Sequence, residues 1–533
     1  MTDEFNLLDE PWIPVRPLGI ASIRDVSLLD AVLNAHQFAE IVHPSPIVTL
    51  VLHRFVIAFL YSAFRGPDRL SALERILDRG SFDETVVRQY AAKWRHRFFL
   101  FGDAPILQDP LLAEELRADK EQPLPAEQLR RETALPNGKT LFDHTLPGSP
   151  SLALAEATRY LIAYQFFGLR DGRGYERSPV STGIATYVRG HSLFQTLALN
   201  LLPYNTNSPI PGTVLTDDAP TWEVKELPDI PPGWLAYLTR PYRRALLVGD
   251  LSGGVFGVYR KAGPGLDNQW RASLRDPWLT YVTRKTGPRA VSLDGRRALW
   301  RDSEVLLRAL VDRGPDDAKY KRILARIGTH AAVEAVGVLA SDASISMWRR
   351  ESLPVATESF GEGALSVLGQ ALQAAEDAGY AVRRGCDELG RFVLIPNWDR
   401  LAPKDQSKQW QALTKRPGPR KRSRLDHFVD SLAPLTTYWP ALDVPFRTYM
   451  LQLAADYESD FGEAADAWWV GQVSRAARDA FEQACRDLET ESRGYRAAAG
   501  ARPRFRYLLG EALKPLQPEQ SMEPTPELEE VSP

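Results

Sequence analysis

The composition of the chain changes after Pro354, and this change constrains the fold more than any other feature of the sequence. Beyond that point the chain is rich in Ala, Leu and Glu, and apolar residues recur with the period of about 3.6 residues that an amphipathic helix requires. Helices with short connections pack as antiparallel neighbours, so residues 356–515 are predicted to form an antiparallel four-helix bundle. The four periodic segments are Gly361–Glu388, Leu425–Glu458, Ala464–Glu491 and Pro503–Leu513.

Three prolines, Pro434, Pro440 and Pro445, interrupt the second of these segments. Proline has no backbone N–H and its ring clashes with the preceding turn, so this helix is predicted to be kinked or to consist of separate pieces. Residues 516–533 are rich in Pro, Glu and Ser, and they are predicted to form a disordered acidic tail.

Residues 1–355 mix helical and strand patterns, which predicts a large mixed α/β domain in front of the bundle and an α+β fold class for the whole chain. Residues 103–150 have weak periodicity and are predicted to form a long loop. The helical patterns are Pro46–Phe64, Ser71–His96 and Ser303–Leu310, and Ser27 is the expected N-cap of an earlier helix. The predicted strands are Phe98–Phe101, Arg244–Val248, Gly254–Tyr259, Trp278–Val282, Ala290–Leu293 and Val333–Leu339.

Composition excludes several classes of protein. With 44% hydrophobic and 25% charged residues, the chain has enough apolar material for sizeable cores. Its two cysteines, Cys386 and Cys485, exclude a disulfide framework and any all-cysteine zinc site. The first residues lack a signal-peptide pattern, and the most apolar window, Ile47–Tyr61, contains His53 and Arg54 and is too short to span a bilayer. The sequence therefore predicts a cytoplasmic protein with no membrane partner.

The chain lacks the usual catalytic and metal-binding motifs. Its eight histidines show no metal-ligand spacing, and no G-x-S-x-G elbow occurs. Gly138-Lys-Thr140 resembles the end of a phosphate-binding loop, but Thr133 stands where the first glycine is required. Pro315-Asp-Asp-Ala-Lys319 resembles a nuclease cluster without the separate acidic strand that metal catalysis needs. These observations favour a binding protein without a metal or cofactor.

A glycine-bearing polar loop, Gly168-Leu-Arg-Asp-Gly-Arg-Gly174, lies between two apolar segments. Glycine allows positive φ and lets the backbone approach another surface closely. Arg170, Arg173 and Arg177 give this stretch positive charge. A flexible basic backbone suits docking against a phosphate-lined groove, and an ordinary surface loop is the alternative.

Other segments suit contacts with nucleic acid, each with a simpler alternative. The small polar stretch 340–346 lies between two apolar strands and predicts a hairpin, either an ordinary one or one that reaches into a groove. The basic run Lys415–Arg424 either touches phosphates or is solvated. Leu141–His144 pairs an aromatic ring with polar groups, which suits stacking on a base or anchoring of its own loop. Lys261 and Arg271 are among the basic residues that accompany the predicted strands.

Phe5-Asn-Leu-Leu-Asp-Glu-Pro-Trp-Ile-Pro-Val15 resembles the N-terminal signature of the large subunit of the type I-E CRISPR surveillance complex Cascade, the CasA family. The similarity continues through the loop around Phe142, the 168–174 loop, Thr186-Tyr-Val-Arg-Gly190, Asp218-Ala-Pro-Thr-Trp222 and the C-terminal bundle. It covers nearly the whole chain, and the order and spacing of the motifs make it more specific than any one of them.

The resemblance implies a non-catalytic subunit that recognises a protospacer-adjacent motif in double-stranded DNA through the minor groove and helps to open the duplex. Guide pairing then reads the remaining sequence, as in RNA-guided effectors generally. The implied partners are the CRISPR guide RNA, target double-stranded DNA, the other Cascade subunits (backbone and small subunits) and a helicase-nuclease that the complex recruits. The implied domains are 1–355, for motif recognition and guide-handle contact, and 356–515, the bundle.

The resemblance also assigns roles to individual residues. The minor-groove loop maps to Gly168, Arg170, Gly172, Arg173 and Gly174. The wedge that splits the duplex maps to Ser341, Asp342, Ala343 and Ser344, where the glutamine common at the tip is missing. The contact to the guide-RNA handle maps to Phe142, Asp143 and His144. No lysine stands at 268–271, where the family's groove-reading lysine falls, so groove or backbone contacts are assigned to Lys261, Arg271, Arg420, Lys421 and Arg422.

Two other functions remain as alternatives from the sequence. One is an RNA-binding scaffold subunit of a ribonucleoprotein that reads no DNA motif. The other is a metal-dependent nuclease that uses Asp316 or Asp317. Loss of assembly when the 168–174 loop is altered favours the scaffold, and metal-dependent activity that requires either aspartate favours the nuclease.

Overall fold

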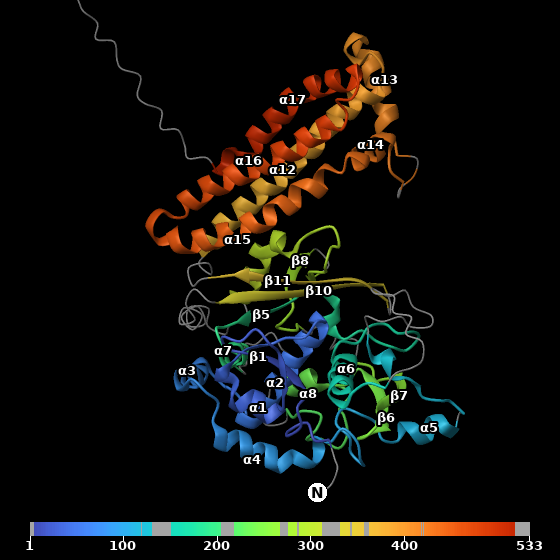
Figure 1. The fold of residues 1–533 in the computed structure, drawn as a ribbon, viewed down its shortest axis with the longest axis vertical. Helices are drawn as coiled ribbons and strands as arrows, with labels where there is room; N and C mark the ends of the chain where they lie inside the picture. The colour runs from blue at the N-terminus through green and yellow to red at the C-terminus, as the bar shows by residue number, and fades with distance from the viewer. Residues whose placement is uncertain are drawn as a thin grey trace, which may run out of the picture. The chain divides into compact units, whose positions relative to one another are not determined.

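The structure is a computed structural model of the 533-residue chain. It describes residues 5–118, 120–130, 151–203, 218–266, 275–284, 287–311, 331–341, 344–355, 362–416, 418 and 421–516. The chain divides into two compact units, residues 1–360 and 361–533. The fold class is the predicted one, because helices and small sheets are mixed in the first unit and the second unit is a helical bundle (Figure 1).

The N-terminal unit is built around helix α2, Pro46–Phe64, which the sequence predicted with the same bounds. Every residue from Pro46 to Ser62 is buried. The helix packs against helices α4 (Glu84–Trp94), α6 (Leu154–Phe166) and α8 (Trp234–Thr239). It is the one described helix long and apolar enough to cross a membrane, and 89% of its apolar window is buried inside the protein. Its apolar composition is therefore that of a core helix.

A buried ion pair ties α2 to the rest of the unit. The two terminal nitrogens of Arg54 donate to the Asp276 carboxylate at 3.1 and 2.9 Å. The Tyr237 hydroxyl and the Trp278 amide donate to the same carboxylate at 2.6 and 2.8 Å. A buried pair is tolerable only when hydrogen bonds satisfy both charges, and here both are satisfied.

The described residues of the N-terminal unit form four small sheets, in the strand orders β2-β1-β3, β11-β10-β5, β4-β7-β6 and β8-β9. Neighbouring strands run antiparallel in each of these sheets. The strands are β1 Ile13–Pro17, β2 Arg24–Val26, β3 Phe38–Ile41, β4 Leu124–Pro125, β5 Ala185–Arg189, β6 Arg243–Asp250, β7 Gly254–Ala262, β8 Tyr281–Arg284, β9 Gly287–Ala290, β10 Ala332–Ser341 and β11 Ser344–Pro354.

Short helices complete the N-terminal unit. Ser27 is the N-cap of helix α1, Leu28–Leu33, as predicted, and its side chain accepts a hydrogen bond from the Asp30 amide. The remaining elements are η1 Ala35–Gln37, α3 Leu70–Arg79, η2 Arg95–Arg97, α5 Leu112–Ala118, η3 Ala126–Leu129, η4 Pro179–Thr182, α7 Leu193–Leu199, η5 Leu299–Asp302 and α10 Ser303–Val311.

Several predicted elements differ from the structure. Phe98–Phe101 is not a strand, because it forms only an isolated bridge between Phe99 and Asn6. Helix α5 and strand β4 lie within 103–150, where a long loop was expected. The predicted strands Trp278–Val282 and Ala290–Leu293 shift to 281–284 and 287–290, and the two observed strands pair antiparallel.

The C-terminal unit contains the four long helices of a bundle. Helices α12, α15, α16 and α17 lie side by side in Figure 1, with α13 and α14 at one end of the bundle. The stacked rings of Phe481 and Phe505, 4.2 Å apart, join α16 to α17. The indole nitrogen of Trp469 donates to the Ala371 carbonyl at 3.0 Å and joins α16 to α12. The bounds are α12 Glu362–Leu394, α13 Pro403–Thr414, α14 Arg424–Leu432, α15 Pro434–Asp460, α16 Glu463–Arg486 and α17 Ser492–Leu513.

The prolines of this unit differ in whether they interrupt a helix. The helix predicted over 425–458 is in two pieces, which separate at Ala433, where φ is 46°, immediately before Pro434. Pro440 and Pro445 lie inside α15, and Pro503 lies inside α17, which begins eleven residues before the predicted start at Pro503. The tertiary packing of a long apolar face therefore overrides the cost of an internal proline at these three positions.

Two buried histidines in the N-terminal unit predict a pH-dependent stability. Burial is the main cause that lowers the pKa of His53, and that of His43, to about 4. Both rings are neutral in the folded state at pH 7, and the unfolded chain takes up protons first as pH falls below about 6.5. The His53 contribution to stability is therefore fully present above pH 6.5 and decreases as pH falls towards 4, by about 3 kcal/mol.

We expect His53→Asn to flatten this dependence in chemical denaturation curves recorded between pH 8 and 4. Asparagine retains a donor for the Thr49 carbonyl, to which the His53 ring nitrogen lies at 2.8 Å. Wild-type protein is the reference at each pH, and His36, an exposed ring, is the control position. An unchanged pH slope in His53→Asn contradicts the assignment.

Candidate nucleic-acid interface

The glycine loop connects helix α6 to η4, and its residues divide into a buried base and an exposed tip. Gly168 is buried, and a side chain there would lie 3.2 Å from the guanidinium of Arg243. Gly172 and Gly174 are exposed and have φ values of +142° and +84°, which side-chain-bearing residues rarely adopt. Three glycines therefore serve two purposes: close packing at the base and a left-handed backbone at the tip.

The buried guanidinium of Arg243, from strand β6, holds the base of this loop. Its terminal nitrogens donate to the carbonyl oxygens of Leu169 and of Glu176, the latter at 2.9 Å. Its Nε donates to the Asp171 carboxylate at 3.3 Å. The rings of Tyr164 and Tyr175 lie on the guanidinium, with centroids 5.9 and 5.0 Å away. The base of the loop is therefore held around the Arg243 guanidinium, although the tip of the loop carries flexible glycines.

Sequence reasoning missed Arg243, although the strand pattern contained a signal. In a strand, alternate side chains point to the same face. Along β6, Arg243 is buried with Ala245 and Leu247, whereas Arg244 lies on the other face, partly exposed. Arg243 precedes the predicted strand Arg244–Val248 by one residue, so extending that strand by one position would have placed it among the interior side chains.

The two exposed arginines of the loop tip are Arg170 and Arg173. Within the described part of the chain, neither forms an ion pair. Asp171, between them, turns inward to Arg243, and its side chain is only 2% exposed. The loop therefore presents two cations to solvent and keeps its carboxylate inside.

The loop is connected to the predicted wedge hairpin by a direct hydrogen bond. Arg177 donates to the carbonyl oxygen of Ala340 at 3.1 Å, close to the end of β10. Strands β10 and β11 pair as far as Ser341 and Ser344, with an irregularity between Leu339 and Ala340. Asp342 and Ala343, which join the strands, lie outside the described residues. The structure therefore brings the two sequence-predicted elements into contact at Ala340, near the end of β10.

Ion pairs fix the base of the hairpin. The Glu334 carboxylate on β10 lies 2.7 Å from Arg189 of β5 and 2.9 Å from Arg350 of β11. Arg350 also pairs with Glu40 of β3, at 3.2 Å, and Glu40 pairs with Arg16 of β1 at 2.7 Å. Burial raises the pKa of Glu334, but Arg350 and Arg189 outweigh this effect, and the net pKa lies below its usual value. The charged network anchors the hairpin to β5 of its own sheet and to the neighbouring sheet that contains β1 and β3.

The other sequence-predicted contacts are only partly described. Lys261 lies on β7 and its ammonium forms an ion pair with Glu115 at 2.7 Å. Lys421 and Arg422 are exposed, and Arg422 pairs with Asp430 of α14. Arg271, Arg420 and the guide-handle residues Phe142, Asp143 and His144 lie outside the described residues, as do Gly138–Thr140, Asp316 and Asp317.

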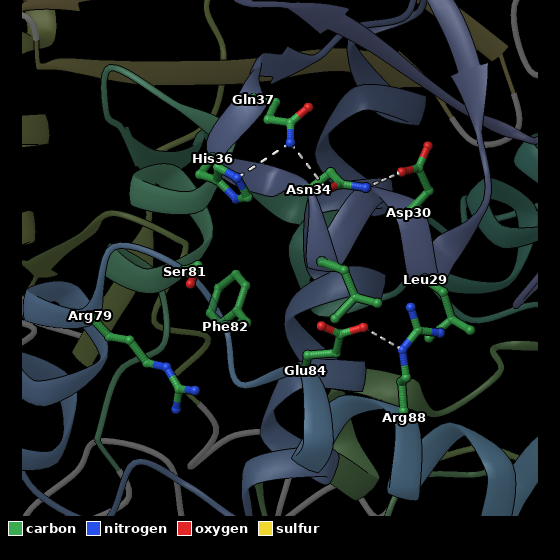
Figure 2. A pocket seen from close by; sticks show the side chains of 11 residues that line it. Leu29, Asp30, Asn34, His36, Gln37, Arg79, Ser81, Phe82, Glu84 and Arg88 are labelled. Carbon is green, nitrogen blue, oxygen red and sulfur yellow. Dashed lines mark hydrogen bonds and ion pairs between the residues drawn. The ribbon is translucent and has the colours of Figure 1, made fainter.

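Figure 2 shows a surface pocket in the N-terminal unit that none of the predicted site residues lines. It lies between α1 and η1 on one side and the 79–88 segment on the other. Its charged groups pair locally: Arg88 lies 2.7 Å from Glu84, and the Asn34 side chain donates to Asp30 at 2.6 Å. The pocket is therefore a feature separate from the loop and the hairpin.

Among the described residues, no group of three His, Cys, Asp or Glu side chains is arranged to hold a metal ion. Cys386 and Cys485 are buried free thiols in α12 and α16, and burial raises the pKa of both. Both thiols therefore act as small apolar groups of the bundle core.

The fold and the sequence together define the class of the protein as CRISPR-associated. A family model described as CRISPR-associated protein Cse1 matches residues 6–480. A CRISPR-associated protein CasA/Cse1 from Thermus thermophilus is 31% identical over 96% of this chain and 98% of its own length. The solved structure of Thermus thermophilus CasA (Cse1) superposes with a TM-score of 0.73 at 27% identity, and the match covers 96% of this chain and 100% of that one.

The chain therefore belongs to the CasA (Cse1) family, the large subunits of type I-E CRISPR surveillance complexes, and the resemblance found in the sequence is confirmed. A chain of a structure described as a CRISPR RNA-guided surveillance complex has the same fold, with a TM-score of 0.67 at 20% identity. That match covers 94% of this chain and 99% of the other.

We predict that Arg243→Gln frees the base of the glycine loop. Removing one partner of a buried, hydrogen-bonded ion pair costs about 3–5 kcal/mol, because the remaining carboxylate stays buried without its cation. Hydrogen exchange at the amides of residues 169–178 is expected to accelerate, and chemical denaturation to report the loss of stability. Arg244→Gln is the matched control, since its partly exposed ion pairs are worth about 0–1 kcal/mol. Equal effects of the two substitutions contradict the assigned role of Arg243.

Proposed function

We propose that this protein is the non-catalytic, motif-reading subunit of its CRISPR RNA-guided complex. In this proposal it recognises the protospacer-adjacent motif in double-stranded DNA through the minor groove and helps to open the duplex for guide pairing. A recruited helicase-nuclease then cuts the DNA. The other Cascade subunits and the guide RNA are its partners, and the cytoplasm is its location.

One observation carries the proposal: the glycine loop and the hairpin meet through the hydrogen bond from Arg177 to Ala340. A loop that reads a motif and a hairpin that enters the adjacent base step must act on neighbouring positions of the same duplex. Their attachment to one another supports that requirement. The rigid bases of both elements, held by Arg243 and Glu334, support it further, because a loosely held wedge would bend before it separated base pairs.

The exposed tip of the loop has the chemistry for a minor groove. The groove is only about 6 Å wide, so a backbone carrying glycines enters it more readily than one carrying side chains. Arg170 and Arg173 stand where they would reach the phosphates that line the groove. The minor groove distinguishes A·T from G·C and little else, so the loop would accept several related motifs.

The proposal leaves most of the sequence reading to the guide RNA, as in RNA-guided effectors generally. Unstacking a base step costs a few kcal/mol, which contacts to the backbone and the displaced strand must offset. A chain with a formal net charge of −3 would bind naked DNA weakly. Its motif reading is therefore expected within the assembled complex.

The direct test measures binding of duplex DNA to the guide-RNA complex assembled with and without this protein, on targets with an intact or a scrambled flanking motif. We expect binding to require the protein and to decrease when the motif is scrambled. Gly172→Leu should weaken binding to the intact target by about tenfold, or ~1.4 kcal/mol, because it places a side chain at a positive φ in the groove-facing tip.

Gly102→Leu is the control, since Gly102 has a φ of +114° and open space around it outside the loop. Equal affinity for both targets would mean that the protein is a general DNA clamp. Loss of assembly with Gly172→Leu would instead favour an RNA-binding scaffold subunit.

We further expect Arg177→Gln to separate motif binding from duplex opening. The variant loses the connection between the loop and the hairpin but keeps Arg170 and Arg173. Opening, followed with a fluorescent base analogue next to the motif, should slow by about fivefold, or ~1 kcal/mol, the value of one hydrogen bond. Binding to a target that is already unpaired next to the motif should be unchanged. Arg170→Gln is the comparison, because loss of a phosphate contact weakens binding to both targets. Equal effects of Arg177→Gln on the two targets would contradict the coupling.

A further inference from the structure

Helix α17 differs from the other helices of the bundle in its charge. It carries five arginines and one carboxylate, Glu511. Helix α12 carries three arginines and five acidic residues, α15 one and four, and α16 three and four. Of these four helices, α17 is therefore the one with a net positive charge.

Most of the positive charge of α17 is not used inside the protein. The Arg502 guanidinium pairs with Glu482 and Glu489, both at 2.8 Å, and the Nε of Arg493 donates to the Phe392 carbonyl at 3.5 Å. Among the described residues, the other four arginines of the helix form no ion pair. By contrast, Arg383 and Arg384 of α12 pair with Asp426 and Asp387. The unpaired cations are therefore available to an external anion.

These cations share a face with an exposed aromatic ring. Arg493, Arg496, Arg504 and Tyr507 project within an arc of about 80° around the helix axis, and all four are exposed. Tyr507 is 59% exposed, and the guanidinium of Arg504 lies over its ring, 5.4 Å from the centroid. We call these four residues the α17 face. An aromatic ring of this size on a charged, exposed face is typical of a surface on which something packs.

A pocket at the first turns of α17 extends this face. Phe392, Trp398, Arg493, Arg496 and Gly500 are among its lining residues. A side chain at position 500 would lie 2.6 Å from the Phe392 ring, so the glycine lets that ring lie against the helix. The pocket therefore combines aromatic walls with two guanidinium groups, and one carboxylate, Asp399, also lines it.

We propose that the α17 face and this pocket bind single-stranded DNA. Guanidinium groups along a groove follow a phosphate backbone, and aromatic rings stack on unpaired bases without sequence preference. Duplex bases are already stacked on one another, so the exposed Tyr507 ring and the half-buried Phe392 ring favour a single strand over a duplex, whereas the Arg391 guanidinium already lies over the Trp398 ring, 5.0 Å from its centroid. Resting on the proposed function, the strand is the one displaced when the target duplex opens.

The test uses the full chain and a fluorescein-labelled oligothymidylate, with binding followed by anisotropy across a salt series. The double substitution Arg493→Gln and Arg496→Gln should reduce the slope of log K against log salt by about 1.4, since each single-strand phosphate contact contributes about 0.7. Tyr507→Leu should weaken binding by about tenfold without changing the slope, because it removes one stacking partner.

The matched control is Arg475→Gln with Arg478→Gln on α16, two exposed arginines at the same spacing and with the same change in net charge. The proposal would be overturned if the control variant weakened single-strand binding as much as the α17 variant does. It would also be overturned if neither variant weakened binding. Equal weakening of duplex and single strand would make the face a duplex clamp. Loss of the variant from the assembled complex would make it a protein-docking surface. Either result contradicts the assignment.

The assembled complex separates this proposal from motif reading. The α17 variant should retain the preference for an intact flanking motif, while an opened target dissociates several-fold faster. If the wild-type complex shows no motif preference but the α17 variant still loses single-strand affinity, the proposed function fails and the α17 face stands. If motif preference is normal and the α17 variant binds single strands as well as the wild type does, the proposal for the α17 face is wrong and the proposed function is unaffected.

Discussion

The interaction on which the candidate site depends is the buried contact between Arg243 and the loop that surrounds it. Removing a guanidinium from water is expensive, and the protein offsets this cost with loop carbonyls, the Asp171 carboxylate and two tyrosine faces. Because the Leu169 carbonyl and the Asp171 carboxylate belong to the loop, the loop cannot open without leaving part of the charge unsatisfied. A segment rich in glycine, which would otherwise sample many conformations, is in this way restricted at its base and free only at its tip.

The same principle recurs in the N-terminal unit. Arg54 and Asp276 are 222 residues apart in the sequence. Glu334 pairs with Arg189 and Arg350, which lie 145 and 16 residues from it in the sequence. Buried ion pairs of this kind add little net stability compared with apolar side chains of similar volume. They do penalise any register that separates the partners, because a strand shifted by one residue would leave a carboxylate buried alone. We infer that they fix the position of the hairpin relative to β1, β3 and β5.

Sequence reasoning reached the parts of the fold that rest on local pattern. Helix α2 was predicted with its observed bounds because a long apolar run between Pro46 and Phe64 has only one compact solution. The run Phe98–Phe101 was misassigned because four apolar residues fit a strand or a buried coil equally well. In the candidate site, the glycines and arginines between Gly168 and Gly174 were enough to predict the loop from the sequence. Arg243 was missed because the predicted strand began one residue too late, and the Arg177–Ala340 contact was missed because it joins distant parts of the chain.

The distribution of charge explains how a chain with a formal net charge of −3 can serve a polyanion. Arg170 and Arg173 lie at the loop tip, and four arginines without an ion pair among the described residues lie on α17, while the buried cations Arg54 and Arg243 pair with Asp276 and Asp171. In the proposed function, each small cluster would bind nucleic acid weakly and would lose affinity as salt rises. Linked clusters that engage one target convert the second contact into an intramolecular one, with an effective concentration set by the geometry between them. Under this proposal, weak separate sites on an acidic protein would discriminate against DNA that satisfies only one of them, which a uniformly basic surface would not do.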